Sequence, residues 1–425
     1  MTKSKRSGVE LPDEDALVRE IVGLRRGFHE LPDALSAESA ARIRRQALEQ
    51  IMGVKLTALG SYSLDAERAA ARHCENFIGA AQVPVGITGP LRIRGRWVSE
   101  EEDIFVPLAT TEGALIASTN RGCRAIRDAG GAVVRVEDVG VTRAPVFRTS
   151  GIEDTSRFLD WVVDNESEIR RVMEETSSYL RLIDIRPQVF GTSIYLRFRF
   201  SSGDAMGMNM ATVACDRAVH GLIEPATGVP CVALSGNFCV DKKPSAVNFL
   251  EGRGKRVHAE VVLEKRILED CLKTTASELV EVQYRKNLLG SIAAGSMGFN
   301  AHFANVLAAF FIATGQDVAQ VAEGSMGVTC VEPRGEGGVI ASVFLPDLPL
   351  GAVGGGTALD TQQEALALLG VHRPTERSGG AAMRLAEILG ATVLAGELSL
   401  LAAFTSGDLA SAHERLGRGP LPGAG

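Results

Sequence analysis

The stretch Thr110-Thr-Glu-Gly-Ala-Leu-Ile-Ala-Ser-Thr-Asn-Arg-Gly-Cys123 holds a single carboxylate among small, hydroxyl-bearing and apolar residues. With few charged neighbours in sequence, Glu112 is easily desolvated, and desolvation would raise its pKa so that it holds a proton near neutral pH. The following residues, from Gly113 to Arg127, are expected to form a helix whose small side chains permit close packing. A solvated glutamate before an ordinary helix is the alternative that this stretch alone leaves open.

A second stretch, Ser235-Gly-Asn-Phe-Cys-Val-Asp-Lys-Lys-Pro244, places two lysines next to each other. Pro244 favours an extended conformation at Lys243, and two adjacent extended residues point to opposite sides. Lys242 and Lys243 are therefore expected to serve different partners. A buried lysine near a carbonyl oxygen would stabilise developing negative charge; a solvated basic turn is the alternative.

The apolar stretch from Leu307 to Val321 contains one acidic residue, Asp317, just past an expected helix break. A carboxylate in such a stretch needs a partner, and Lys242 is a suitable one. Upstream, His302 and Asn305 share a helix face at i, i+3 spacing. His302 also fits a core histidine with its hydrogen bonds satisfied.

Two glycine-containing segments are candidate ligand loops. In Ser202-Gly-Asp-Ala-Met-Gly-Met-Asn-Met210 the glycines leave the backbone accessible at an expected helix start, where anions bind well. Asp204 could bond a ribose or an amide. The segment lacks the G-x-G-x-x-G fingerprint, and its methionines also fit an ordinary core. The run from Gly351 to Thr357 permits close approach of a ligand, although glycine runs are also common in plain turns.

Composition limits the possible classes. The chain has 425 residues, 45% of them hydrophobic and 23% charged, with a formal net charge of -7. This length suggests about two or three domains, and the negative charge argues against a nucleic-acid-binding protein. Seven cysteines without C-x-x-C spacing, and no His/Cys cluster, predict reduced thiols and no metal site. The polar N-terminus and short apolar stretches predict a soluble cytoplasmic protein without a membrane span.

Hydrophobic periodicity predicts an α/β protein. The first 60 residues are expected to be helical, with Ser36 as an N-cap and with an apolar helix face at Leu17, Val18, Ile21 and Leu24. Residues 144–234 alternate between helices (156–164, 166–182, 205–222) and strands (193–200, 232–234), which predicts a compact α/β unit. The last section is expected to be rich in long helices, at 266–286, 302–322, 362–369 and 380–403.

The sequence resembles a known family at several motifs in one order. These motifs are Glu75-Asn-Phe-Ile-Gly79, residues 110–126, 203–210, 235–255, 295–320 and 351–363, and the stretch from Ala395-Gly-Glu-Leu-Ser399 to His413. They are similar to 3-hydroxy-3-methylglutaryl-coenzyme A (HMG-CoA) reductase of class I, in its soluble prokaryotic form. Seven separate motifs in the family's order make a chance match very improbable.

The resemblance implies a role for each matching residue. Glu112 would donate a proton at the carbonyl being reduced, Lys242 would stabilise the oxyanion, and Asp317 would tune both. His413 would protonate the departing coenzyme A thiolate. Substrate would be held by Arg143, Ser235, Lys243, Lys286, Asn305, Glu75, Asn76, Asn120 and Arg121. The nicotinamide cofactor would be held by Ser177, Asp204, Met206, Gly207, Met208, Asn209, Val353, Gly354, Gly355 and Gly356.

The resemblance also implies an architecture and partners. A helical N-terminal region (1–62) would precede a large substrate and coenzyme A domain of helices and sheet (63–143 and 235–425). A small ferredoxin-like domain for NADP (144–234) would be inserted into it. The protein would use NADPH, with NADH possible, and no metal. It would associate into a dimer or tetramer with active sites between subunits.

One departure from the family pattern bears on the cofactor. Relatives commonly carry an arginine facing the 2′-phosphate where this chain has Ser178. A hydroxyl can bond a phosphate but adds no charge, so the preference for NADPH over NADH is weakened. Two other functions remain open: mevalonate oxidation with NAD, and a non-catalytic coenzyme A- or nucleotide-binding regulator.

Overall fold

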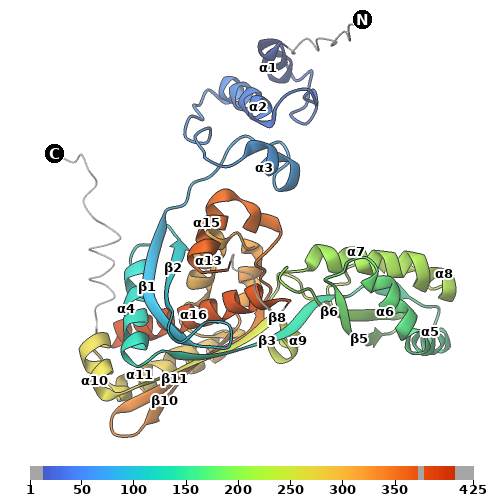
Figure 1. The fold of residues 1–425 in the computed structure, drawn as a ribbon. Helices are drawn as coiled ribbons and strands as arrows, with labels where there is room; N and C mark the ends of the chain where they lie inside the picture. Colours follow the sequence, from blue (N-terminus) through green and yellow to red (C-terminus); the bar gives the residue numbers. More distant parts are fainter. Residues whose placement is uncertain (1–12, 372–377, 407–425) are drawn as a thin grey trace, which may run out of the picture. The chain divides into compact units, whose positions relative to one another are not determined.

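The computed structural model describes residues 13–371 and 378–406 (Figure 1). Contacts divide the chain into two compact units. The first comprises Met1–Val83 with Ala358–Gln363, and the second comprises Pro84–Thr357 with Glu364–Gly425. Each unit is described by itself.

The first unit is helical, as the sequence predicted. Its helices are α1 (Glu14–Val22), α2 (Ala37–Met52) and α3 (Ala66–Arg72). The side chain of Ser36 accepts a hydrogen bond from the Ser39 amide, which confirms the expected N-cap. Buried apolar residues of α1 pack against Ile43 and Ala47 of α2. The prediction for Leu24 was wrong: it lies past the end of α1 at φ 55° and is exposed.

The described part of the second unit is built on one extended sheet of eleven strands. The strands are β1 (Val85–Arg94), β2 (Asp103–Ala109), β3 (Ala132–Arg143), β4 (Val146–Arg148), β5 (Arg181–Phe190), β6 (Ser193–Ser201), β7 (Cys231–Ala233), β8 (Arg253–Leu263), β9 (Gly298–Phe299), β10 (Gly327–Arg334) and β11 (Gly338–Leu348). Their main order is β7-β4-β6-β3-β8-β11-β10-β9, with β1 and β2 joined at β3 and β5 joined at β6.

The remaining described helices follow α3 along the chain. They are α4 (Leu115–Asp128), α5 (Ile152–Asp164), α6 (Glu166–Glu174), α7 (Met208–Ala218), α8 (Glu224–Thr227), α9 (Ala246–Glu251), α10 (Lys265–Ile267), α11 (Ala276–Val282), α12 (Ser291–Ala294), α13 (Phe303–Thr314), α14 (Val321–Gly324), α15 (Asp360–Leu368) and α16 (Gly380–Ser406). π-Helical turns form η1 (Val219–Ile223), η2 (Leu268–Leu272) and η3 (Gln283–Gly290), and 3₁₀ turns form η4 (Val318–Gln320) and η5 (Gly355–Ala358).

Strand β3 joins two hydrophobic cores. Its first part, from Val133 to Gly140, pairs antiparallel with β8, and its last residues, Val141 to Arg143, pair with β6. One core lies around α4, α13, α16 and the strands β8 and β11. The other lies between residues 141 and 229, where α5, α6 and α7 cover β5 and β6 (Figure 1). Strand β3 therefore pairs with strands of both parts of the second unit.

Helix α16 is a core helix. Among the described helices it alone is long and apolar enough to cross a membrane, but 83% of its most apolar window is buried in the protein. It packs against α4 so closely that a Cβ on Gly122 would lie 1.9 Å from the carbonyl oxygen of Ala395. The predicted close packing of the small-residue helix is thus confirmed.

The largest difference from the sequence predictions lies in the last section. Residues 253–263, 327–334 and 338–348 form β8, β10 and β11 in a section expected to be rich in helices. The helix expected at 166–182 ends at Glu174, and β5 begins at Arg181. The helix expected at 266–286 is broken at Lys273, which adopts φ 60°, and restarts with Thr275 as N-cap of a capping box.

Candidate active site

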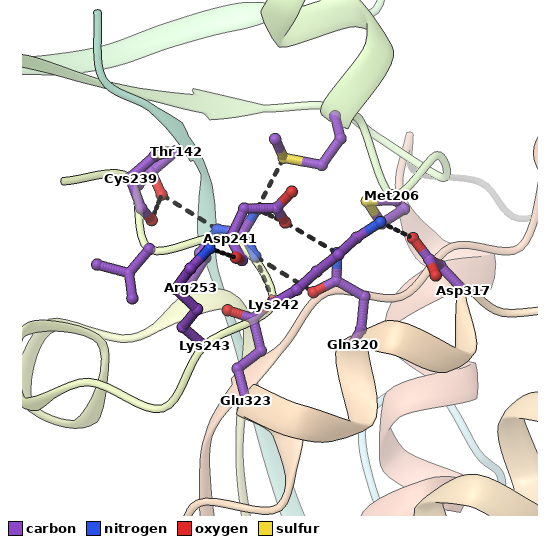
Figure 2. A network of polar contacts seen from close by, with 12 residues as sticks. Thr142, Met206, Cys239, Asp241, Lys242, Lys243, Arg253, Asp317, Gln320 and Glu323 are labelled. Atoms are coloured by element: carbon purple, nitrogen blue, oxygen red, sulfur yellow. Dashed lines mark hydrogen bonds and ion pairs between the residues drawn. The ribbon is translucent and has the colours of Figure 1, made fainter. Parts of the chain in front are cut away.

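Lys242 and Asp317 form an ion pair. The Lys242 Nζ atom lies 2.7 Å from Asp317 Oδ2, as the sequence predicted for this acidic residue (Figure 2). The hydrogen bond to Asp317 raises the pKa of Lys242, while partial burial opposes the rise. The ammonium is therefore cationic at neutral pH. The Lys242 side chain is 42% exposed. A charged donor held in one place can stabilise negative charge that develops on a substrate oxygen.

The loop that carries Lys242 has an unusual backbone. Lys242 itself adopts φ 60°, so the prediction of two adjacent extended lysines was wrong. Asn237 and Val240 also have positive φ, of 65° and 51°. Left-handed conformations are costly for a β-branched residue and are held only where surrounding contacts enforce them. The loop is strained, and it places Lys242 against Asp317.

Asp317 is fixed by a helix break. Helix α13 ends at Thr314, and Gly315 adopts the left-handed conformation of its C-cap. The break expected before Asp317 is confirmed, and the helix expected over 302–322 was too long. Asp317 then caps η4, with its Oδ1 accepting a hydrogen bond from the Ala319 amide. The other oxygen, Oδ2, is left for Lys242. The carboxylate thus has a defined orientation before any ligand binds.

A second polar pair lies at the start of α13. Asn305 donates a hydrogen bond from Nδ2 to Glu112 Oε2 at 2.7 Å. Glu397 of α16 fixes this end of the helix, since its carboxylate accepts from the amides of Ala301 and His302. The Nε2 atom of His302 is buried without a hydrogen-bond partner among the described residues, so the satisfied-histidine alternative is not what the structure has.

The expected desolvation of Glu112 is not found in the single chain. Glu112 is exposed, because it lies in the loop between β2 and α4. Beside it is a pocket of about 590 Å³ whose lining includes Ile87, Phe105 and Asn120. Ile87 and Phe105 are 51% and 48% exposed. Glu112 therefore lies next to an open apolar surface.

The two pairs are separated along α13. Asn305 is in the first turn, and Asp317 follows the last. At 1.5 Å of rise per residue, the helix between Asn305 and Gly315 spans roughly 15 Å. Within one chain, Glu112 and Lys242 therefore lie near opposite ends of α13.

The two predicted nucleotide loops lie together. Ala205 and Val353 form a parallel bridge, and the carbonyl of Asp204 accepts a hydrogen bond from the Ala352 amide at 2.7 Å. The Asp204 side chain accepts from the amide of Ala382 at the start of α16. That oxygen is therefore already used within the protein.

The second loop is also tied to the neighbour of Asp317. Gln316 is buried and pairs through both side-chain groups with the backbone of Gly351, at 2.9 Å each. A Cβ on Gly351 would in turn lie 2.4 Å from the amide nitrogen of Met206. The glycine loops and the Lys242–Asp317 pair therefore form one neighbourhood.

The other predicted cofactor residues divide by burial. Gly207 has φ 95° and caps α7, whose first residue, Met208, is buried in the second core. The core alternative therefore holds for Met208. Asn209 and Val353 are exposed, and Ser177 donates to Met210. Among the remaining glycines, Gly354 and Gly355 have positive φ and Gly356 lies against Gly315.

The predicted substrate residues occupy several places. Ser235 contacts the Cys239 thiol, and Lys243 donates to the carbonyl of Asp241. Arg143 ends β3, and its buried Nε has no hydrogen-bond partner among the described residues. Lys286 lies over the ring of Phe404, with Nζ 5.2 Å from the centroid.

Four further predicted residues complete the set. Asn120 accepts a hydrogen bond from the Gly89 amide, and Arg121 donates to Ser399. Glu75 and Asn76 belong to the first unit, and both are exposed. His413 lies outside the described residues.

The sequence analysis missed a fully buried charged residue near Lys242. Arg253 has a side chain with no exposed area and binds Asp241, the residue before Lys242. Its segment was identified only as part of the family-like motif at residues 235–255. The sequence signal that could have indicated it is an arginine between two glycines at the start of a strand. In the described part of the chain, no group of three or more histidine, cysteine or acidic residues is arranged to hold a metal ion.

Comparisons with known proteins show the family to which the chain is related. A family model described as hydroxymethylglutaryl-coenzyme A reductase matches residues 40–418. The 3-hydroxy-3-methylglutaryl-coenzyme A reductase of Methanothermobacter thermautotrophicus is 49% identical over 393 residues, which are 92% of this chain and 97% of the relative. The protein of the same name from Aeropyrum pernix is 51% identical over 387 residues, 91% of each chain.

A solved structure supports the fold class. The class II 3-hydroxy-3-methylglutaryl-CoA reductase of Streptococcus pneumoniae, bound to NADPH, matches 85% of this chain and 86% of its own, with a TM-score of 0.64. At 17% identity this likeness concerns the fold alone. It confirms the predicted mixed α/β fold. With the family model covering most of the chain and relatives near 50% identity, the chain belongs to the hydroxymethylglutaryl-coenzyme A reductase family.

Proposed function

We propose that this protein is a class I reductase that converts HMG-CoA to mevalonate and coenzyme A with two NADPH, as a soluble enzyme of the cytoplasm. The observation that carries the proposal is the Lys242–Asp317 ion pair beside the joined loops at 204–206 and 351–353. A positioned cation next to an anion-binding loop suits hydride addition to a carbonyl. In this proposal residues 144–234 bind the nucleotide, and residues 63–143 and 235–425 bind the thioester.

The exposed glycine loop fits a nicotinamide nucleotide. Gly354 and Gly355 adopt positive φ, and no atom lies within 4 Å of the place a Cβ would take. Their backbone is therefore open to a flat or phosphorylated group. When bound, the reduced nicotinamide supplies a hydride at the thioester carbon.

The residues of this chain then manage charge and protons. Lys242 stabilises the negative charge that builds on the carbonyl oxygen, and Glu112 provides a proton to that oxygen. As the C–S bond of the resulting hemithioacetal breaks, its hydroxyl proton returns to Glu112 and an aldehyde forms. The thiolate of coenzyme A leaves and takes a proton from His413. A second hydride and a proton reduce the aldehyde to the alcohol.

We further propose that the site is shared between subunits of a dimer or of a tetramer. The Glu112–Asn305 pair and the Lys242–Asp317 pair lie at opposite ends of α13, too far apart to act on one carbonyl within a chain. The exposed Ile87 and Phe105 beside Glu112 suit burial against a second copy. In such an assembly Glu112 of one chain meets Lys242 of another.

A stoichiometric assay tests the function. The purified protein is mixed with HMG-CoA and excess NADPH, while absorbance at the nicotinamide band and free thiol are both measured. The proposal expects two NADPH oxidised for each thiol released. Consumption of NADH with little use of NADPH would overturn the cofactor assignment, and binding without turnover would indicate a non-catalytic regulator.

A further inference from the structure

All five N–H donors of the Arg253 guanidinium have acceptors. The Nε atom donates to Thr142 Oγ1 at 3.1 Å, and the two terminal nitrogens donate to Gln320, Glu323, Met208 and Asp241. The side chain has no exposed area. An arginine whose five N–H groups all donate hydrogen bonds is held in one orientation. A lysine carries a single compact charge and cannot be fixed in this way. Figure 2 shows this network converging on the loop of Lys242.

The backbone on both sides of Arg253 is arranged to bring it there. Gly252 and Gly254 have φ of 77° and 70°. A Cβ on Gly254 would lie 2.5 Å from the carbonyl oxygen of Leu348. The register of β8 against β11 is shifted at this point, where Arg253 faces Asp347. The irregular start of β8 thus turns a charged side chain into the interior.

Burial and neighbouring charges shift the pKa values of the carboxyl groups around Arg253. Burial opposes ionisation of Asp241, but the charges of Arg253 and Lys242 together with hydrogen bonds from Gln320 and Arg253 outweigh it, so the pKa of Asp241 is lowered. Burial raises the pKa of Glu323, and burial together with the charge of Glu323 raises the pKa of Asp347 well above its usual range. Burial therefore disfavours the ionised form of these two carboxyl groups, whereas the ionised form of Asp241 is favoured beside the guanidinium.

The acceptors of Arg253 belong to every segment that meets at the Lys242–Asp317 pair. Asp241 precedes Lys242 in the strained loop. The side-chain amide of Gln320 donates to Asp241 at 3.0 Å, and the backbone amide of Gln320 donates to the carbonyl of Asp317. Thr142 lies in β3 and also donates to the carbonyl of Cys239, at 2.8 Å.

Met208 connects the Arg253 network to the part of the chain proposed to bind the nucleotide. It is the first residue of α7 and directly follows Gly207, the left-handed cap of that helix. A contact between its sulfur and Arg253 therefore ties the start of α7 to the segment that carries Lys242. The Arg253 side chain thus contacts both the start of α7 and the loop that carries Lys242.

We propose that Arg253 is a positioning residue for hydride transfer, which fixes the Lys242–Asp317 pair relative to the start of α7. This inference rests on the proposed reductase function. Arg253 reaches no substrate itself, because it is enclosed by protein groups on all five donors. Its removal should impair the chemical step more than substrate binding, since small displacements of a catalytic group lower the rate steeply.

The test compares two arginine-to-lysine variants. Arg253→Lys keeps the buried charge but cannot bind five acceptors. Arg384→Lys is the matched control, because Arg384 is also buried, pairs with Glu102 and binds the carbonyl of Leu369, away from the Lys242 loop. Both are assayed for kcat, for KM, and for the kinetic isotope effect with reduced nicotinamide deuterated at the transferred position.

The expected result separates chemistry from binding. Arg253→Lys should lower kcat roughly tenfold or more, change either KM less than about threefold, and increase the isotope effect on kcat. Arg384→Lys should resemble the wild type in all three. A folded Arg253→Lys protein with the kcat and isotope effect of the control would overturn the proposal. A wild-type protein that does not oxidise NADPH with HMG-CoA would instead contradict the reductase function itself.

A milder variant decides the matter if Arg253→Lys does not fold. Met208→Leu conserves volume and leaves the other four acceptors of Arg253 in place, so it should be tolerated by the core. It removes only the sulfur contact to α7. A lower kcat with a larger isotope effect would support the positioning role, and wild-type values of both would overturn it.

Discussion

Lys242 and Asp317 lie 2.7 Å apart, yet their side chains are 42% and 34% exposed. Ion pairs this accessible contribute about 0–1 kcal/mol to folding. The loop that presents Lys242 meanwhile contains strained residues such as Val240. A strained loop that ends in a weakly stabilising pair is better explained by catalysis than by stability.

Lys242→Ala should remove the stabilisation of the oxyanion while leaving the fold intact. We expect kcat to fall by about 10²–10³-fold and the melting temperature to change little. Lys265→Ala is the control, since Lys265 is exposed and forms an ion pair with Glu269 on the same helical face. Steady-state NADPH oxidation and differential scanning fluorimetry give the two measurements. Full activity in Lys242→Ala would remove Lys242 from the mechanism.

Asn305 should act through Glu112. Its amide donates to the carboxylate at 2.7 Å, so Asn305→Leu leaves Glu112 without that support. We expect kcat to fall roughly tenfold in Asn305→Leu, and by more in Glu112→Gln. If the two residues act as a unit, the double variant should be no slower than Glu112→Gln. Additive losses in this double-mutant cycle would show that Asn305 contributes independently of Glu112.

Stability should depend on pH through Glu387. Burial raises its pKa from the ordinary 4.5 to about 7, against hydrogen bonds from the amides of Trp97 and Val98. A carboxyl group whose folded-state pKa is raised stabilises the fold below pH 4.5, and this contribution is lost as pH rises through 7. The full shift corresponds to about 3 kcal/mol.

Glu387→Gln should remove this pH dependence. The amide group of glutamine has one acceptor oxygen fewer than the carboxylate, so the variant loses one hydrogen bond to the turn at residues 96–98. This loss is the same at every pH. The melting temperature of the variant should therefore lie further below the wild type at pH 5 than at pH 8. Parallel curves for the two proteins between these pH values would show that Glu387 does not titrate there.

Ser178→Arg should restore a charge for the 2′-phosphate of NADP. Ser178 is exposed in the turn between α6 and β5, where a longer side chain meets no steric barrier. Because hydrogen bonds to charged groups contribute about 1.5–3 kcal/mol, we expect the ratio of kcat/KM for NADPH to that for NADH to rise about tenfold or more. Ser178→Gln, of similar length but neutral, should change the ratio little. An unchanged ratio in Ser178→Arg would place the phosphate elsewhere.

Gly122 should be indispensable to the core. A Cβ there would meet the carbonyl of Ala395 at 1.9 Å, so Gly122→Ala must push α4 away from α16. We expect a loss of about 2–4 kcal/mol in the free energy of unfolding. Gly221→Ala is the matched control, because no atom lies within 4 Å of its Cβ position. Urea unfolding of both variants gives the comparison, and equal stabilities would contradict the packing described for α4 and α16.

The sequence predicted elements whose signals are local. Ser36 caps its helix, α13 breaks at Gly315, and the apolar stretch from Gly380 forms a long core helix. The partner of Asp317 could also be predicted, because a carboxylate in an apolar stretch needs a cation.

The strands of the last section were missed for an identifiable reason. In β8 the buried residues Val257, Ala259 and Val261 alternate with polar ones, which is a strand signal present in the sequence. It lies among longer apolar helices, whose stronger pattern dominated the interpretation. Burial of Arg253 and exposure of Glu112 were beyond prediction, since both depend on which distant segments pack against them.

The central claim is that Glu112 and Lys242 of different chains meet at one thioester. Glu112→Gln and Lys242→Ala proteins, each inactive alone, can be mixed, dissociated and reassembled, and NADPH oxidation then measured. In a dimer with shared sites, random reassembly leaves one intact site in each mixed dimer, so activity should recover to about a quarter of the wild type. A mixture that contains mixed dimers and remains inactive would contradict the account, because both residues would then have to come from the same chain.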